Sequence, residues 1–169
     1  MTPDPTVPDS FGSPSVGRRP EDRLADLGLT LPDPFPPAAA YVAVRVEGAT
    51  AYVSGHGPML HGKVQIRGKV GLDLTEADGY EAAKLTCLNV LASLKAHLGQ
   101  LSRIRGFLKL LVLVNATEDF EHHPHVADGA SDLILAVFGP GAVHARSAIG
   151  VASLPFSIAT EVEAVVAID

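Results

Sequence analysis

The chain has 169 residues, of which 47% are hydrophobic and 19% charged, and its formal net charge is −6. This length and hydrophobic content predict a folded domain with a substantial core and exclude a disordered chain. The acidic balance argues against non-specific nucleic-acid binding. The single cysteine, Cys87, excludes an intrachain disulfide, and no segment is apolar enough to span a bilayer or resembles a secretory signal, so we expect a cytoplasmic protein with no membrane partner.

The N-terminal part of the chain is rich in Pro, Ser, Gly and Asp over residues 1–20. We expect this segment to be a disordered tail, and residues 21–169 to form a single domain. Leucines at a helical spacing predict a short helix over Glu21–Leu29. The prolines of Leu31–Pro37 predict an extended linker, because each one fixes φ and restrains the residue before it.

Strand patterns follow the linker. Tyr41–Glu47 and Ala51–Gly55 flank a Gly-Ala-Thr turn, which predicts a hairpin, and Lys63–Ile66 is a further short strand candidate. A long helix is expected to begin after a Thr75 cap and to end at Gly99, with one apolar face.

The second half of the chain predicts a long strand, a second helix and two apolar strands. The long strand covers Ile104–Val114, and strict alternation places Leu108 on its apolar face and Phe107 on its mixed face. The second long helix covers His125–Phe138. One of the last two strands surrounds Arg146, and the other covers Thr160–Ile168.

This order of elements predicts an α+β fold with a mixed sheet and both long helices on one face. We expect the two last strands to be neighbours, and the uncovered face of the sheet to carry Arg146 and Glu161. A bare face of this kind predicts an oligomer.

Arg146 is the first candidate functional residue. It shares a strand face with His144 and Ala148, and a guanidinium on such a strand is costly to bury without a partner or a ligand. Its planar donors suit a carboxylate ligand. The alternative is a structural ion pair between Arg146 and a strand glutamate such as Glu161 or Glu163.

Histidines supply the other candidate sites. The run Glu121-His-His-Pro-His125 resembles a metal-ligand cluster, but proline breaks an i, i+4 arrangement and no cysteine joins it. We interpret His122, His123 and His125 as part of a solvated loop or helix entrance, and we assign no metal ligand. His56 either touches a cleft or is a hydrogen-bonded structural histidine.

Several segments together resemble one family over residues 21–169. They are Tyr41, Tyr52-Val-Ser-Gly55, Ala145-Arg-Ser147, Leu154-Pro155 and Glu161-Val-Glu-Ala164, and they are similar to segments of the RidA/YjgF family, also labelled endoribonuclease L-PSP or translation-inhibitor-like. Gly129-Ala-Ser-Asp132 and the sequence around Arg146 resemble a divergent branch.

The resemblance implies a chorismate-mutase-like fold of the bacillus type, assembled as a homotrimeric barrel with a ligand cleft at each subunit interface. It also implies hydrolysis of small reactive 2-imino or enamine acids to 2-keto acids and ammonia, without a metal or an organic cofactor. Arg146 would hold the substrate carboxylate and Glu161 would position the attacking water. Ser54 and Gly55 would bind the substrate or water, and Tyr41 would close the pocket.

Two positions depart from the family pattern. Ala148 stands where the active enamine deaminases carry a cysteine, and Asp128 stands where they carry an asparagine, so both are candidate binding positions. An aspartate there would repel a substrate carboxylate. A second hypothesis is therefore a non-catalytic trimer that binds a small carboxylate metabolite through Arg146. A third is an endoribonuclease, which the acidic composition disfavours.

Overall fold

A computed structural model of the chain describes residues 18–34 and 39–169. Most of the expected N-terminal tail, residues 1–17, and part of the expected linker, residues 35–38, lie outside the described residues. Arg18 and Arg19 precede the first helix, which begins at Pro20, so the last residue of the expected tail is helical.

Within the described residues, the chain forms three α-helices and seven strands. The helices are α1 (Pro20–Asp26), α2 (Glu76–Leu98) and α3 (His123–Phe138). The strands are β1 (Val44–Glu47), β2 (Thr50–His56), β3 (Met59–Leu60), β4 (Lys63–Val64), β5 (Ile104–Asn115), β6 (Ala145–Val151) and β7 (Thr160–Ile168). No helix of the described residues is long and apolar enough to cross a membrane.

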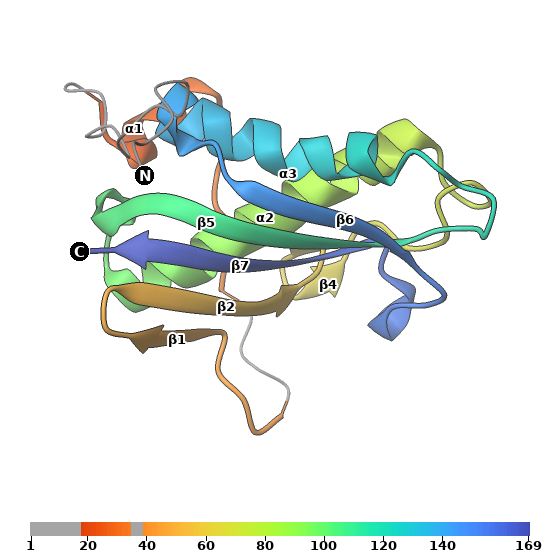
Figure 1. Cartoon of the computed structure of the whole chain (residues 1–169), viewed down its shortest axis with the longest axis horizontal. Helices are drawn as coiled ribbons and strands as arrows, with labels where there is room; N and C mark the ends of the chain where they lie inside the picture. The colour runs from red at the N-terminus through yellow and green to blue at the C-terminus, as the bar shows by residue number, and fades with distance from the viewer. Residues whose placement is uncertain (1–17, 35–38) are drawn as a thin grey trace, which may run out of the picture.

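Five of these strands form one mixed sheet in the order β1-β2-β7-β5-β6. The β5–β6 pair is parallel and the other neighbours are antiparallel, while β3 and β4 form a separate hairpin. Helices α2 and α3 lie against the same side of the sheet (Figure 1). The predicted α+β fold with both long helices on one face is therefore confirmed.

The helix signals in the sequence correspond to local contacts in the structure. The Thr75 hydroxyl accepts the backbone N–H of Asp78 at 3.1 Å, and the Asp78 carboxylate accepts the N–H of Thr75 at 2.9 Å, so α2 begins with a capping box. Close packing of α2 against α3 depends on Gly129, because a Cβ there would lie 2.1 Å from the carbonyl oxygen of Tyr80.

The core lies between the helices and the sheet, and β5 departs from strict alternation in its first half. The register of β5 against β7 shifts between Phe107 and Lys109. Phe107 is therefore buried on the helix side, with its ring centroid 5.3 Å from that of Phe138, while Leu108 is only partly buried. The assignment of Leu108 to the core face was wrong, because a bulge resets a two-residue period that the sequence alone does not interrupt.

The placement of the two candidate catalytic residues also differs from expectation. β5 lies between β6 and β7, so the strands of Arg146 and Glu161 are not neighbours. Arg146 is in register with Leu110, which is buried in the core under the helices, whereas Glu161 is in register with Leu113 on the uncovered face. The prediction that the uncovered face carries both residues was therefore wrong.

The uncovered face carries several large apolar side chains. Tyr52 and Ile149 are 50% and 47% exposed there, and both are large side chains. Leu111, Leu113 and Val165 lie between them on the intervening strands and are partly buried. Glu163, which is exposed and in register with Leu111, and Lys109, which donates to the Ser147 hydroxyl, add charge to this face. Exposed large apolar side chains on a sheet are typical of a surface that another protein covers.

Candidate functional site

A pocket of about 300 Å³ lies where β2 and β7 meet the loop that precedes β7. Five candidate residues from the sequence line it: Tyr41, Ser54, Gly55, His56 and Glu161. These residues are separated by up to 120 positions in the chain, and the pairing of β2 with β7 brings them together. Their individual roles stay predictions.

Glu161 is the ionisable group at the centre of this pocket. Its carboxylate lies directly over Gly55, where a Cβ would be only 2.1 Å from Oε1, so any larger residue at this position would displace the carboxylate. Glu161 forms no hydrogen bond or ion pair with any residue that the structure describes. Burial, together with the charge of Glu163, raises the pKa of Glu161 above its ordinary value. The pocket thus holds a carboxylate that is more basic than usual and without a protein partner among the described residues.

Two other polar side chains of the pocket, Ser54 and Asn89, have their hydrogens engaged, whereas the Tyr41 hydroxyl donates to no residue that the structure describes. The Ser54 hydroxyl donates to the carbonyl of Val42 at 2.7 Å. The Asn89 amide donates to the carbonyls of Met59 and Leu85, both at 2.9 Å. The side-chain oxygens of Ser54 and Asn89 can therefore only accept hydrogen bonds from a ligand. With Glu161, they make a pocket that favours a cationic, N–H-bearing ligand.

His56 lines the same pocket, but it is hydrogen-bonded on both sides. Its Nδ1 lies 2.6 Å from the carbonyl oxygen of Ser54, and its Nε2 lies 2.7 Å from the hydroxyl of Ser93. The Nδ1 atom therefore carries the proton, and Nε2 accepts from Ser93. Because burial lowers the pKa of His56, the ring is neutral at physiological pH and shapes the pocket instead of supplying charge.

Phe156 forms part of the rim and was not singled out from the sequence. Its side chain is 74% exposed, and its φ of 56° lies in the left-handed region, as does that of Ser157. Non-glycine residues in this region are strained, and such residues are enriched at binding sites. No periodicity or motif in the sequence distinguishes Phe156.

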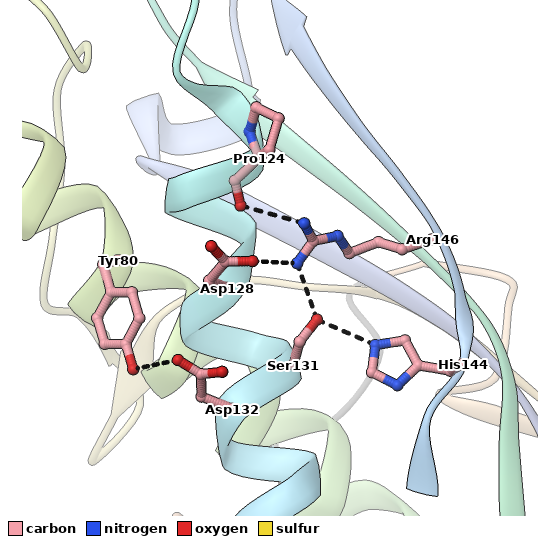
Figure 2. A network of polar contacts seen from close by, with 7 residues as sticks. All are labelled: Tyr80, Pro124, Asp128, Ser131, Asp132, His144 and Arg146. Carbon is pink, nitrogen blue, oxygen red and sulfur yellow. Dashed lines mark hydrogen bonds and ion pairs between the residues drawn. The ribbon is translucent and has the colours of Figure 1, made fainter.

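The second candidate cluster surrounds Arg146 on the opposite face of the sheet (Figure 2). Its Nη1 donates to Asp128 at 2.8 Å and to the hydroxyl of Ser131 at 2.9 Å, and its Nη2 donates to the carbonyl of Pro124 at 3.2 Å. His144 contacts the same hydroxyl at 3.0 Å. Arg146 does form an ion pair, but its partner is an aspartate of α3 and not a strand glutamate.

Arg146 still has donors available for a ligand. A guanidinium has five N–H donors, and the bonds to Asp128, Ser131 and Pro124 use two on Nη1 and one on Nη2. The remaining two, on Nε and Nη2, donate to no residue that the structure describes. These two donors share one edge of the guanidinium, and such an edge binds a carboxylate in a bidentate way. The side chain is 21% exposed.

The structure therefore divides the candidate residues into two groups. Arg146, Asp128 and Ala148 lie at the α3–β6 contact, where Ala148 packs against the core. Glu161 and the other pocket residues lie across the sheet, so one chain does not bring the two groups into one cleft.

Metal-ligand residue types form a third cluster at the starts of α2 and α3. Among the described residues, Glu76, His122 and His125 have their ligand atoms within 4.8 Å of one another. None of the three lines the pocket.

Known proteins resemble this chain over most of its length. A sequence model of the family described as "YjgF/chorismate mutase-like, putative endoribonuclease" matches residues 21–163. Protein TCP17 of Trypanosoma cruzi is 42% identical over 144 residues, which are 85% of this chain and 90% of that protein.

Solved structures of related proteins also resemble this chain. The protein Atu1372 from Agrobacterium tumefaciens, described as having unknown function, is 44% identical with a TM-score of 0.83, and the alignment covers 89% of this chain and 92% of that one. A Shewanella oneidensis protein with the same endoribonuclease label is 34% identical with a TM-score of 0.86, over 89% of this chain and 100% of that one. RidA from a Psychrobacter species, at 21% identity and a TM-score of 0.55 over 82% of this chain and 96% of that one, shares the fold. The chain belongs to the YjgF/chorismate mutase-like family.

Proposed function

We propose that this protein hydrolyses small, reactive 2-imino acids in a cleft formed by two copies of the chain. The observation that carries the proposal is Glu161, a half-buried carboxylate with a raised pKa and no described partner, in a pocket of about 300 Å³. A general base is most effective when its pKa approaches the working pH, and burial moves Glu161 in that direction.

The proposed reaction needs only water and the substrate. Glu161 accepts a proton from a water molecule as its oxygen forms a bond to the carbon of the protonated imine, and the C=N double bond becomes single. Glu161 then returns this proton to the nitrogen of the carbinolamine, the C–N bond breaks to release ammonia, and the hydroxyl forms the C=O bond as it loses its proton to Glu161, which leaves a 2-keto acid. Glu161 holds the water and transfers the proton, which requires hydrogen-bond reach but no fixed metal.

The polarity of the pocket supports a substrate with an iminium group. The pocket offers oxygen acceptors from Ser54, Asn89 and Glu161, which suit the N–H groups of an iminium. It offers no cation of its own among the described residues for the substrate carboxylate. The free edge of Arg146 suits that carboxylate, so the iminium end of the substrate fits the pocket of Glu161 and the carboxylate end fits the Arg146 cluster.

A shared site follows from the separation of these clusters. Arg146 and Glu161 lie on opposite faces of the sheet in one chain, so a small substrate that contacts both needs Arg146 from one copy and Glu161 from another. The apolar uncovered face around Tyr52 and Ile149 supports such an assembly, and we propose the homotrimer that the family resemblance implies.

The test generates 2-iminopropanoate in solution and follows the formation of pyruvate. Wild type should exceed the uncatalysed rate, and Glu161→Gln and Arg146→Ala should each lower kcat/KM at least about 100-fold. Glu47→Gln is the matched control, because Glu47 is exposed at the end of β1, outside the pocket, and is not among the groups that shift the pKa of Glu161. A wild-type rate equal to buffer would refute hydrolysis of this substrate.

A binding measurement distinguishes the non-catalytic alternative. The alternative is motivated by Ala148 and Asp128, which change the surroundings of Arg146 from the family pattern. Binding of a 2-keto acid that Arg146→Ala abolishes, without any hydrolysis, would favour a carboxylate-binding protein. RNA cleavage at physiological salt would favour the endoribonuclease label of the family, against which the net charge of −6 argues.

A further inference from the structure

Three side chains from the first turns of α2 and α3 converge on one point of the surface. His122 Nδ1 lies 2.7 Å from Oε2 of Glu76, and His125 Nδ1 lies 3.1 Å from Oε1 of the same carboxylate. The two imidazole centroids are 5.3 Å apart. One carboxylate thus faces two imidazole nitrogens that come from a different helix.

Local structure explains why the two histidines point the same way. His122 is the N-cap of α3, and its carbonyl accepts the N–H of His125 at 3.0 Å, so both residues belong to one turn. Glu76 is the first residue of α2, and the packing of α2 against α3 brings it to this turn. Hydrogen bonding to His122, the largest effect, holds the pKa of Glu76 below its ordinary value; burial opposes this, and the hydrogen bond to His125 adds to it.

We propose that Glu76, His122 and His125 form a binding site for a divalent transition-metal ion, with Zn²⁺ the best fit. Two imidazoles and one carboxylate are a ligand set that Zn²⁺ accepts, at bond lengths of about 2.0–2.2 Å. Tetrahedral coordination at these lengths places ligand atoms about 3.3 Å apart. Each imidazole nitrogen lies 2.7 or 3.1 Å from a different oxygen of Glu76, and one ligand atom from each of the three residues lies within 4.8 Å of the others, so small side-chain rotations bring the set to this geometry.

Binding of the ion changes the proton positions of the two histidines and replaces their contacts with Glu76. Each neutral imidazole would carry its proton on Nε2, which frees Nδ1 to coordinate the metal in place of its contact with Glu76. The histidine side chains are 61% and 63% exposed and that of Glu76 is 41% exposed, so water can enter and occupy the fourth position.

Charge around the site is mixed. The first turns of two helices place partial positive charge near the ion, which disfavours a cation. The segment just before α3 contains Glu118, Asp119 and Glu121, all exposed, and these carboxylates oppose that effect.

A bound ion would also stabilise the turn that holds Arg146. Pro124 lies between the two histidines, and its carbonyl accepts an N–H of Arg146 at 3.2 Å (Figure 2). Fixing His122 and His125 to Glu76 therefore fixes one of the three acceptors of the guanidinium. The metal site itself does not depend on any activity of the protein.

The test is calorimetric titration of Zn²⁺ into tag-free, chelator-treated protein. We expect about one ion per chain with a Kd in the micromolar range or below, and a rise in Tm with added Zn²⁺ because the ion binds only the folded turn. Co²⁺ in place of Zn²⁺ should give the intense visible absorption of a tetrahedral site.

Variants distinguish this site from general binding by the seven histidines of the chain. Glu76→Gln keeps the size and a hydrogen-bond acceptor of the carboxylate, so it should fold normally and weaken Zn²⁺ binding at least about 10-fold. His125→Ala should have a similar effect, while His97→Ala, on an exposed part of α2, should have none. An unchanged affinity in Glu76→Gln and His125→Ala, or equal losses in all three variants, would overturn the proposal.

Discussion

Asp128→Asn tests whether Arg146 can hold a carboxylate while it is ion-paired. Asp128 contacts Nη1 of Arg146 at 2.8 Å, so the pair is neutral before any ligand arrives. A ligand carboxylate on the free Nε/Nη2 edge would lie about 7 Å from that of Asp128. At effective dielectric constants of about 20–40, two like charges at this distance repel by about 1–2 kcal/mol.

Removing this repulsion should tighten the binding of a small carboxylate about 10-fold. Asparagine retains an oxygen that accepts the N–H of Nη1, so Arg146 should keep its position. Loss of a partly exposed ion pair should lower the free energy of unfolding by about 1 kcal/mol or less. The Kd of 2-oxobutanoate, measured by calorimetry at low ionic strength, checks this expectation. The gain should shrink at high salt.

Asp132→Asn is the matched control, because Asp132 lies one turn further along α3 and accepts from the hydroxyl of Tyr80 at 3.0 Å instead of from Arg146. Binding that is unchanged or weaker in Asp128→Asn would refute the role of Arg146 as a carboxylate anchor. An equal gain in carboxylate affinity in both variants would show that the effect comes from the overall charge of α3 and not from the contact of Asp128 with Arg146.

Three further predictions concern the pocket and the core. Gly55→Ala should lower kcat/KM at least about 100-fold, because a Cβ would lie 2.1 Å from Oε1 of Glu161 and displace the carboxylate; steady-state assays of pyruvate formation check this. The raised pKa of Glu161 means that the folded state binds its proton more tightly, so ionisation costs stability as pH rises above the ordinary value of 4.5; Glu161→Gln should therefore be more stable than wild type at pH 7, with the difference lost at pH 3, in urea unfolding. Burial raises the pKa of Cys87 to about 12, so its thiol should not react with a disulfide reagent at pH 8 until the protein is denatured, and fast reaction of the native protein would contradict its burial.

The helices and the last strand could be predicted because their signals are local. Thr75, Asp78 and Gly99 mark both ends of α2 within a few residues of the chain, and α2 runs from Glu76 to Leu98. The alternation of Thr160–Ile168 likewise matches β7. Such signals depend on backbone hydrogen bonds and burial of one face, which neighbouring residues determine.

The order of strands and the covered face of the sheet could not be predicted in the same way. Alternation shows that Arg146 and Ser147 face opposite sides of β6, but either side is compatible with the sequence until α3 packs against one of them. The parallel β5–β6 pair then separates Arg146 from the strand of Glu161. These outcomes depend on long-range packing.

The pocket was predicted only through the family resemblance. Tyr41, Ser54 and Glu161 carry no local pattern that would join them, and their meeting depends on the pairing of β2 with β7. The histidine cluster could be predicted in part. The sequence contains His122 and His125, but its third member, Glu76, is 46 residues away and only helix packing reveals it.

Mixing two inactive variants tests the shared site most directly. Arg146→Ala and Glu161→Ala copies, unfolded together in equal amounts and refolded, should form interfaces that combine the intact Glu161 of one copy with the intact Arg146 of another. If each site takes one residue from each of two copies in a closed ring, about a quarter of the sites should be restored, and pyruvate formation should rise to about a quarter of the wild-type rate. A mixture of correctly folded variants that is no more active than either variant alone would contradict a site shared between copies.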